Sequence, residues 1–202
     1  MASDKKELRK EKNRLEILDT AEQVFARQGF HTTTMEAVAE ECGWSKGTLY
    51  LHFKSKEDLF FSVINEKLDK FTSTLKSASS AAQDIEQLIR ALVDAQFQFF
   101  IENKDFFQLA ITEQGKVMHG SDSGMRESLI EKQHRHVVMT SQAIKRHLPE
   151  SSTIRPDTLA RSIMGAINIH TLTWLLQPES INPKQLKQEI TQLFLHGVTP
   201  HV

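Results

Sequence analysis

Cysteine is almost absent from this sequence. Cys42 is the only one among 202 residues, which excludes an internal disulfide and any zinc site built on a pair of cysteines. Proline and glycine are also scarce, at 5 and 8 residues, which excludes collagen-like chains and Pro/Gly-rich disordered chains. The chain between them is rich in Leu, Ile, Glu, Lys, Gln and Ala, so we expect an all-helical fold.

Long apolar runs are missing as well. No run approaches the ~20 apolar residues that a membrane-spanning helix needs, and the N-terminus, MASDKKELRKEKNR, lacks the apolar stretch of a secretory signal. We therefore expect a cytoplasmic protein without membrane contacts. Glycine-rich nucleotide loops and HExxH are absent too, so we expect no enzyme, no metal site and no cofactor.

Charge is balanced overall but unevenly distributed. The formal net charge of −1 argues against a protein that coats nucleic acid indiscriminately. Residues 1–14 hold six Lys or Arg against three acids, a net of +3, so the remaining chain carries −4. A basic arm before an acidic body fits a protein that touches phosphate at one end. A solubilising tail is an equally good explanation for Lys5 and Lys6.

Residues 33–59, TTMEAVAEECGWSKGTLYLHFKSKEDL, are typical of two short helices joined by a tight turn. Thr33 and Glu36 fit a T-x-x-E capping box for the first helix, and Gly43 supplies the backbone freedom of the turn. Ser45 is a good N-cap for the second helix. In a helix-turn-helix, the second helix enters the major groove of DNA. An ordinary helical hairpin shares this turn, so the turn alone leaves both interpretations open.

The sequence of this segment closely resembles the N-terminal domain of TetR-like bacterial transcription regulators. The resemblance starts in the helix around residues 15–25, passes through Gly29-Phe30, and ends in GxSxGTxYxHFxSKExL at residues 43–59. It covers about the first third of the chain. It implies a helix-turn-helix domain of three helices, residues 1–56, followed by a larger helical domain, residues 57–202, that binds a ligand and dimerises.

The resemblance also implies DNA contacts by a defined set of side chains. They are Thr33, Thr34, Ser45, Lys46, Gly47, Thr48, Tyr50, His52 and Lys56. Lys46 is the best candidate for a base contact, since an amine reaches the O6 and N7 acceptors of guanine. The family lysine that matches Lys56 holds a phosphate.

Three details of this set stay open. One of Thr33 and Thr34 caps the helix and the other is free for a phosphate, and the sequence does not assign which. For His52, DNA contact and packing carry similar weight. Leu51 is expected to face the core, although family members vary at this position.

Apolar periodicity predicts the remaining helices. They cover residues 10–28, 56–75, 85–102, a stretch from 106, then 125–148, 157–176 and 183–196. Residues 77–84, SASSAAQD, are expected to form a break that Asp84 ends as a cap, and residues 119–124 a flexible Gly/Ser loop. The helices at 157–176 and 183–196 resemble the pair through which family members dimerise. They would otherwise only complete the core of the monomer.

Five phenylalanines fall within eleven positions, 97–107. Such density marks a core more often than a pocket, but a pocket for a small hydrophobic effector also needs apolar walls. The candidate pocket residues are Phe97, Phe100, Phe107, Ile111, Met139 and Trp174. The sequence therefore predicts a homodimeric repressor of a palindromic DNA operator that such an effector releases. A helical DNA-binding protein without an effector is the alternative.

Overall fold

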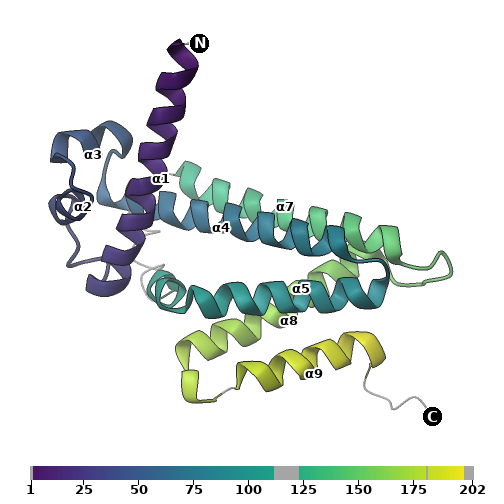
Figure 1. Ribbon diagram of the computed structural model, residues 1–202. Coiled ribbons are helices and arrows are strands. Elements are labelled where there is room, and N and C mark those ends of the chain that lie inside the picture. The colour runs from purple at the N-terminus through teal and green to yellow at the C-terminus, as the bar shows by residue number, and fades with distance from the viewer. Residues whose placement is uncertain (1, 112–122, 181, 198–202) are drawn as a thin grey trace. The chain divides into compact units, whose positions relative to one another are not determined.

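The computed structural model describes residues 2–111, 123–180 and 182–197 (Figure 1). Every regular element in these ranges is helical, which confirms the predicted fold class. The elements are α1 (Ala2–Gln28), α2 (Met35–Glu41), α3 (Lys46–His52), α4 (Lys56–Ala81), α5 (Ile85–Glu102), α7 (Ser123–His147), α8 (Pro156–Leu176), the short 3-10 helix η1 (Pro178–Ser180) and α9 (Pro183–His196). A further helix starts at residue 104 and is described as far as 111. Within the described ranges, no helix is long and apolar enough to cross a membrane.

The chain divides into two compact units. Unit 1 contains residues 1–68 and 105–127, and unit 2 contains residues 69–104 and 128–202. α4 therefore begins in unit 1 and ends in unit 2. This division follows packing, whereas the predicted boundary between residues 56 and 57 follows function. That boundary stays a prediction.

The core of unit 1 is aromatic. The Phe25 ring lies 5.0 Å from the Phe60 ring, which in turn lies 5.8 Å from the ring of Phe106. All three side chains are almost completely buried, and Leu49 of α3 is fully buried too. The regularly spaced apolar residues of α1 and α4 thus form the packed core that supports α2 and α3.

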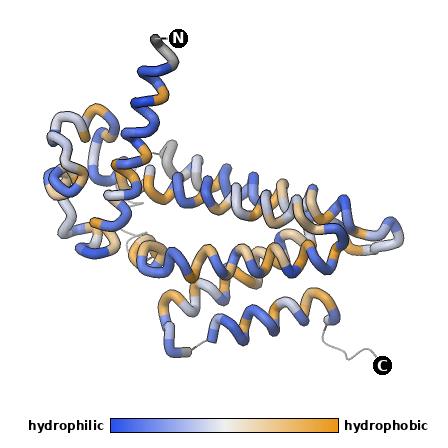
Figure 2. Tube along the Cα trace, viewed as in Figure 1, coloured by the Kyte–Doolittle hydropathy of each residue, from blue (hydrophilic) through white to orange (hydrophobic). Residues whose placement is uncertain are grey.

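In unit 2, α5 packs against both α8 and α9, and α8 packs against α9. Their buried residues recur at helical spacing. They are Leu88, Leu92, Ile163, Ile167, Leu186 and Ile190. Figure 2 shows polar positions recurring between the apolar ones along these helices, as amphipathic helices require.

The sequence prediction was too short for two helices. α1 starts at Ala2, not at Lys10, because the charged residues before Leu15 are strong helix formers. α4 runs on through Ala81, into the predicted break at residues 77–84. There Ser79 and Ser80 satisfy their hydroxyls on the carbonyls one turn earlier, which lets small polar residues stay helical. The loop predicted at 119–124 falls largely outside the described residues.

Candidate DNA-binding surface

Two helix caps and a glycine turn shape the segment from α2 to α3. The Thr34 hydroxyl accepts a hydrogen bond from Ala37 N at 3.1 Å and so caps α2. Gly43 then turns the chain with a φ of +70°, a conformation that side chains with a Cβ disfavour. Ser45 Oγ accepts from Thr48 N at 3.1 Å and caps α3, as the sequence predicted.

The capping box predicted at Thr33 and Glu36 was wrong, because the cap lies one residue later. Thr33 is fully buried, and its hydroxyl donates to the carbonyl of Gly29 at 2.7 Å. It therefore offers no surface to a phosphate in this conformation. Thr34 is exposed and remains the candidate of the two.

α3 divides cleanly into a buried and an exposed face. Leu49 and Phe53 are buried, whereas Lys46, Tyr50 and Leu51 are exposed. Leu51 is 79% exposed, so the expectation that it faces the core was wrong. Its position explains the error, since Leu51 is two residues after the buried Leu49, and residues two apart point to different sides of a helix. Sequence reasoning missed the exposure of Leu51, although its spacing from Leu49 was a usable signal.

Gly47 lies on this exposed face without any internal need for glycine. Its φ is not positive, and a Cβ built there would meet only Ser45 Oγ at 3.8 Å, an ordinary contact. Glycine inside a helix lowers stability by roughly 0.5–1 kcal/mol relative to alanine. The fold therefore leaves this glycine unexplained.

The Lys46 ammonium forms an ion pair with the Glu36 carboxylate, a contact between α3 and α2. The hydrogen bond between them lowers the pKa of Glu36 and raises the pKa of Lys46, so both groups are charged at neutral pH. Lys46 Nζ also lies 5.8 Å from the centre of the Tyr50 ring. The predicted base reader is therefore already engaged, and sequence reasoning missed its partner.

His52 is half-buried at the end of α3. Together with Leu51 it lines a surface cavity of about 480 Å³ whose other walls come from α1: Glu7, Lys10, Glu11 and Arg14. Burial lowers the pKa of His52, and the nearby charges of Lys10 and Arg14 lower it further. The imidazole is thus neutral at pH 7, close to the charges of Lys10 and Arg14. A DNA contact by His52 stays a prediction.

Lys56 begins α4 and connects it to the turn after α1. Its ammonium donates to the carbonyl oxygens of Phe30, at 2.8 Å, and of His31, at 3.1 Å. It also lies 4.6 Å from the centre of the Phe30 ring. An ammonium has three N–H donors, so a phosphate would take the remaining one or displace a carbonyl. The predicted phosphate contact stays a prediction.

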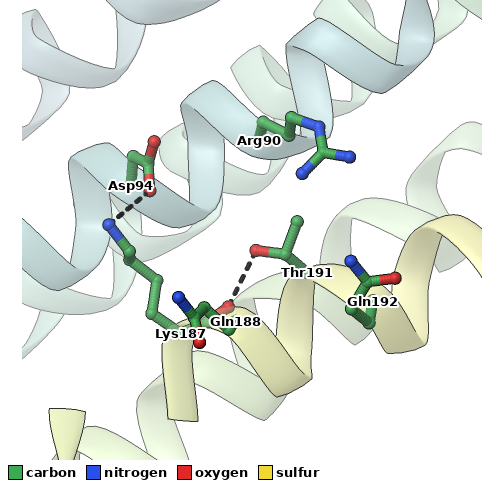
Figure 3. A pocket seen from close by; sticks show the side chains of 6 residues that line it. All are labelled: Arg90, Asp94, Lys187, Gln188, Thr191 and Gln192. Carbon is green, nitrogen blue, oxygen red and sulfur yellow. Dashed lines mark hydrogen bonds and ion pairs between the residues drawn. The ribbon is translucent and has the colours of Figure 1, made fainter. Parts of the chain in front are cut away.

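The six candidate effector-pocket residues are divided between the two units. Phe97 is buried and Phe100, Met139 and Trp174 are half-buried in unit 2, whereas Phe107 and Ile111 belong to unit 1. Unit 2 has a surface cavity of about 260 Å³ between α5 and α9 (Figure 3), lined by Arg90, Asp94, Lys187, Gln188, Thr191 and Gln192. Its lining is entirely polar, with Lys187 and Asp94 paired at 2.9 Å, and does not suit a hydrophobic effector.

Three polar side chains inside unit 2 are more informative. Gln96, Thr140 and Thr171 are almost fully buried, and in the described part of the chain their polar side-chain atoms have no hydrogen-bond partner. They come from α5, α7 and α8. Buried polar groups in proteins are nearly always satisfied, by protein, water or ligand. This interior therefore has unused hydrogen-bonding capacity among apolar neighbours.

Comparison with known proteins bears first on the N-terminal region. Residues 17–63 match the family model described as bacterial regulatory proteins, tetR family. An uncharacterized HTH-type transcriptional regulator of Bacillus subtilis, YerO, is 37% identical over 99 residues, which cover 48% of this chain and 34% of that protein. The chain covers 34% of the length of this relative, and 35% and 47% of two further regulators that it matches. It therefore spans about a third to a half of the length of these relatives.

Other similarities extend over nearly the whole chain. The fatty acid metabolism regulator protein of Bacillus subtilis is 24% identical over 190 residues, which cover 91% of this chain and 94% of that one. The solved structure of the transcriptional regulator FadR from Bacillus subtilis, in complex with stearoyl-CoA, has a TM-score of 0.74 at 18% identity, covering 92% of this chain and 99% of the other. AibR, solved with isovaleryl coenzyme A and operator DNA, has a TM-score of 0.64 at 19% identity, covering 90% and 97%. At these identities the two structures show a shared fold.

Proposed function

We propose that this chain, whose residues 17–63 match the tetR family of bacterial regulatory proteins, is a transcriptional repressor that binds a palindromic DNA operator as a homodimer. The exposed face of α3 would lie in the major groove. The observation that carries the proposal is Gly47, a helix-weakening residue that the fold leaves unexplained. Lys46, Tyr50 and Leu51 surround it with an amine, a phenol and an apolar group, which suit guanine, phosphate and a thymine methyl.

Selection of bound fragments from genomic DNA at physiological salt tests this function. The purified protein should enrich a short inverted repeat whose half-sites are about 34–36 Å apart, or a multiple of that spacing. Lys46→Ala should weaken binding to that site about tenfold, and to a scrambled duplex by less. An equal loss on both duplexes would make Lys46 a phosphate contact. Fragments bound without sequence preference would refute the proposed function.

Dimerisation is proposed through α8 and α9, residues 157–176 and 183–196. Besides its buried face, α8 has a second apolar face that is exposed, made of Gly165, Ile169, Leu172 and Leu176. A Cβ on Gly165 would meet nothing within 4 Å, so another helix has room to approach closely there. Leu193 of α9 is 47% exposed as well. A single helix-turn-helix makes few base contacts, so a specific site requires two copies.

A charge placed on this face tests the dimer. Leu172→Glu should yield a monomer in size-exclusion chromatography with light scattering, and operator binding should be lost with it. Ile154→Glu is the matched control, because Ile154 is also exposed but precedes α8. If both variants stay dimeric, the interface lies elsewhere.

We further propose that the effector carries a fatty acyl group. The carbonyl end would use the free capacity of Gln96, Thr140 and Thr171, and the chain would contact apolar side chains such as Phe97, Phe100 and Met139. Gln96 and Thr140 lie one helical turn from Phe99 and His136, whose rings contact Phe71 at 4.7 and 5.2 Å. The two relatives connected with fatty acids, described above, support the same ligand class.

Thermal denaturation with stearoyl-CoA, with coenzyme A alone and with stearate tests the effector. Stearoyl-CoA at about a hundred times its Kd should stabilise the protein by roughly 2.7 kcal/mol and release operator DNA. Gln96→Leu should lose most of this stabilisation, whereas Gln98→Leu, at an exposed position of the same helix, should keep it. If no acyl compound binds and operator affinity never changes, the protein represses without an effector.

A further inference from the structure

The ion pair between Glu36 and Lys46 places an acid on the surface proposed to face DNA. Glu36 lies in the first turn of α2, and its carboxylate reaches across to the ammonium at the start of α3. Each side chain is 55% exposed, so the pair is open to solvent. The carboxylate, the amine and the Tyr50 ring form a continuous row along the exposed surface of the two helices.

A carboxylate at this position acts against generic DNA binding. It repels the phosphate backbone, and it holds the amine that would otherwise settle on any phosphate oxygen. A G·C base edge in the major groove, unlike a phosphate, offers hydrogen-bond partners to both an amine and a carboxylate. Guanine presents acceptors that suit an amine, and its partner cytosine presents an amino group that suits a carboxylate. The paired charges therefore match a G·C edge without separating.

We propose that Glu36 is a specificity-determining residue that holds Lys46 in an ion pair. A contact of Lys46 with phosphate must break this pair, whereas a G·C edge binds both charges without breaking it. The inference rests on the proposed function, since it requires α3 to face the major groove. It assigns Glu36 a role that differs from that of the neighbouring acids. Glu41 points to α1, where it pairs with Arg27 at 2.9 Å.

A purely structural role for Glu36 would predict that Glu36→Gln loses thermal stability. Exposed ion pairs contribute little to stability, because solvent screens them and ordering two side chains costs entropy. Glu36→Gln should therefore leave the thermal midpoint nearly unchanged and affect DNA binding alone. Glu40→Gln is the matched control, because it removes the same charge one turn further along α2, at an exposed position that does not pair with Lys46.

The experiment measures the affinity of wild type, Glu36→Gln and Glu40→Gln for the selected operator and for a scrambled duplex, over a series of salt concentrations. Glu36→Gln should bind the scrambled duplex about two- to fivefold more tightly than Glu40→Gln does, and the ratio of operator to scrambled affinity should fall by a similar factor. Each G·C pair of the half-site is then replaced by A·T. One replacement should weaken wild type and Glu40→Gln more than it weakens Glu36→Gln, which keeps the amine for guanine but has lost the carboxylate for cytosine.

Two results would overturn the inference. Equal effects of Glu36→Gln and Glu40→Gln on both duplexes would show that only overall charge matters. A parallel loss of affinity and of thermal stability in Glu36→Gln would show that Glu36 supports the fold. Wild-type protein without any preference for the operator would instead refute the proposed function, and that result is obtained before any variant is compared.

Discussion

Phe106 offers the sharpest test of how the two units are built. It is 2% exposed and follows the 36 residues, 69–104, that belong to unit 2, yet it belongs to unit 1. Its ring lies 5.8 Å from Phe60 and 5.9 Å from the ammonium of Lys67, which itself pairs with Glu22 at 2.5 Å. Phe106→Ala should therefore destabilise unit 1, although residue 106 closely follows α5 of unit 2.

The size of the effect follows from burial. Truncating a fully buried phenylalanine to alanine typically costs about 3–5 kcal/mol, because transfer energy is lost and a cavity remains. For a chain of this length, each kcal/mol lowers the thermal midpoint by roughly 2–4 °C. A fall of about 6–20 °C is therefore expected for unit 1.

The two tryptophans allow each unit to be observed separately. Trp44 belongs to unit 1 and Trp174 to unit 2. Fluorescence is followed during unfolding in two backgrounds, Trp174→Phe and Trp44→Phe, at one fixed protein concentration, since dimerisation would shift the midpoint. Phe106→Ala should lower the Trp44 midpoint more than the Trp174 midpoint. Phe100→Ala, in unit 2, should do the reverse.

Equal shifts of the two signals would refute the reasoning, because Phe106 would then support both units alike. An unchanged Trp44 midpoint would refute it as well, since a fully buried ring cannot be removed from a packed core without cost.

Three further predictions concern single residues of unit 1. Thr34→Ala should lower the free energy of unfolding by about 1 kcal/mol in urea titrations, because the cap of α2 is lost, whereas Thr34→Ser should keep it. The pKa of His52 is lowered by burial, so the unfolded chain binds the proton more readily; wild type should lose stability as pH falls below about 6.5, and a His52→Asn variant that loses as much would refute this. Burial raises the pKa of the Cys42 thiol, so folded protein should react far more slowly with a thiol reagent at pH 8 than protein in urea, and equal rates would contradict the burial.

Local signals in the sequence were sufficient for most helix ends. Ser45 and Asp84 were each predicted to cap a helix, and each side chain accepts from a backbone N–H group of the first turn. These predictions succeed because a cap depends on residues two or three places away. Thr33 and Thr34 mark the limit of this reasoning. Two adjacent threonines have the same capping chemistry, and only the packing of Thr33 against the turn after α1 decides between them.

Contacts between residues far apart in the sequence could not be predicted from the sequence pattern. The ion pair of Glu36 with Lys46 spans a turn whose geometry sets which acid of α2 meets the amine. The pairing of Phe60 with Phe106 joins residues far apart in the chain, and apolar spacing along either helix says nothing about which ring it meets. The exposed position of Leu51 was available from its spacing and was overlooked, because leucine was assumed to be buried.

The placement of Phe106 also limits how proteins of this architecture can exchange parts. The region that matches the family model ends at residue 63, so a graft defined by that match leaves out residue 106. Such a chimera would place a foreign aromatic core against the host's residue 106. Recombination between relatives is therefore constrained to donors whose residues at 60 and 106 are compatible in volume, or to grafts with a second junction that carries the start of the helix at residue 104.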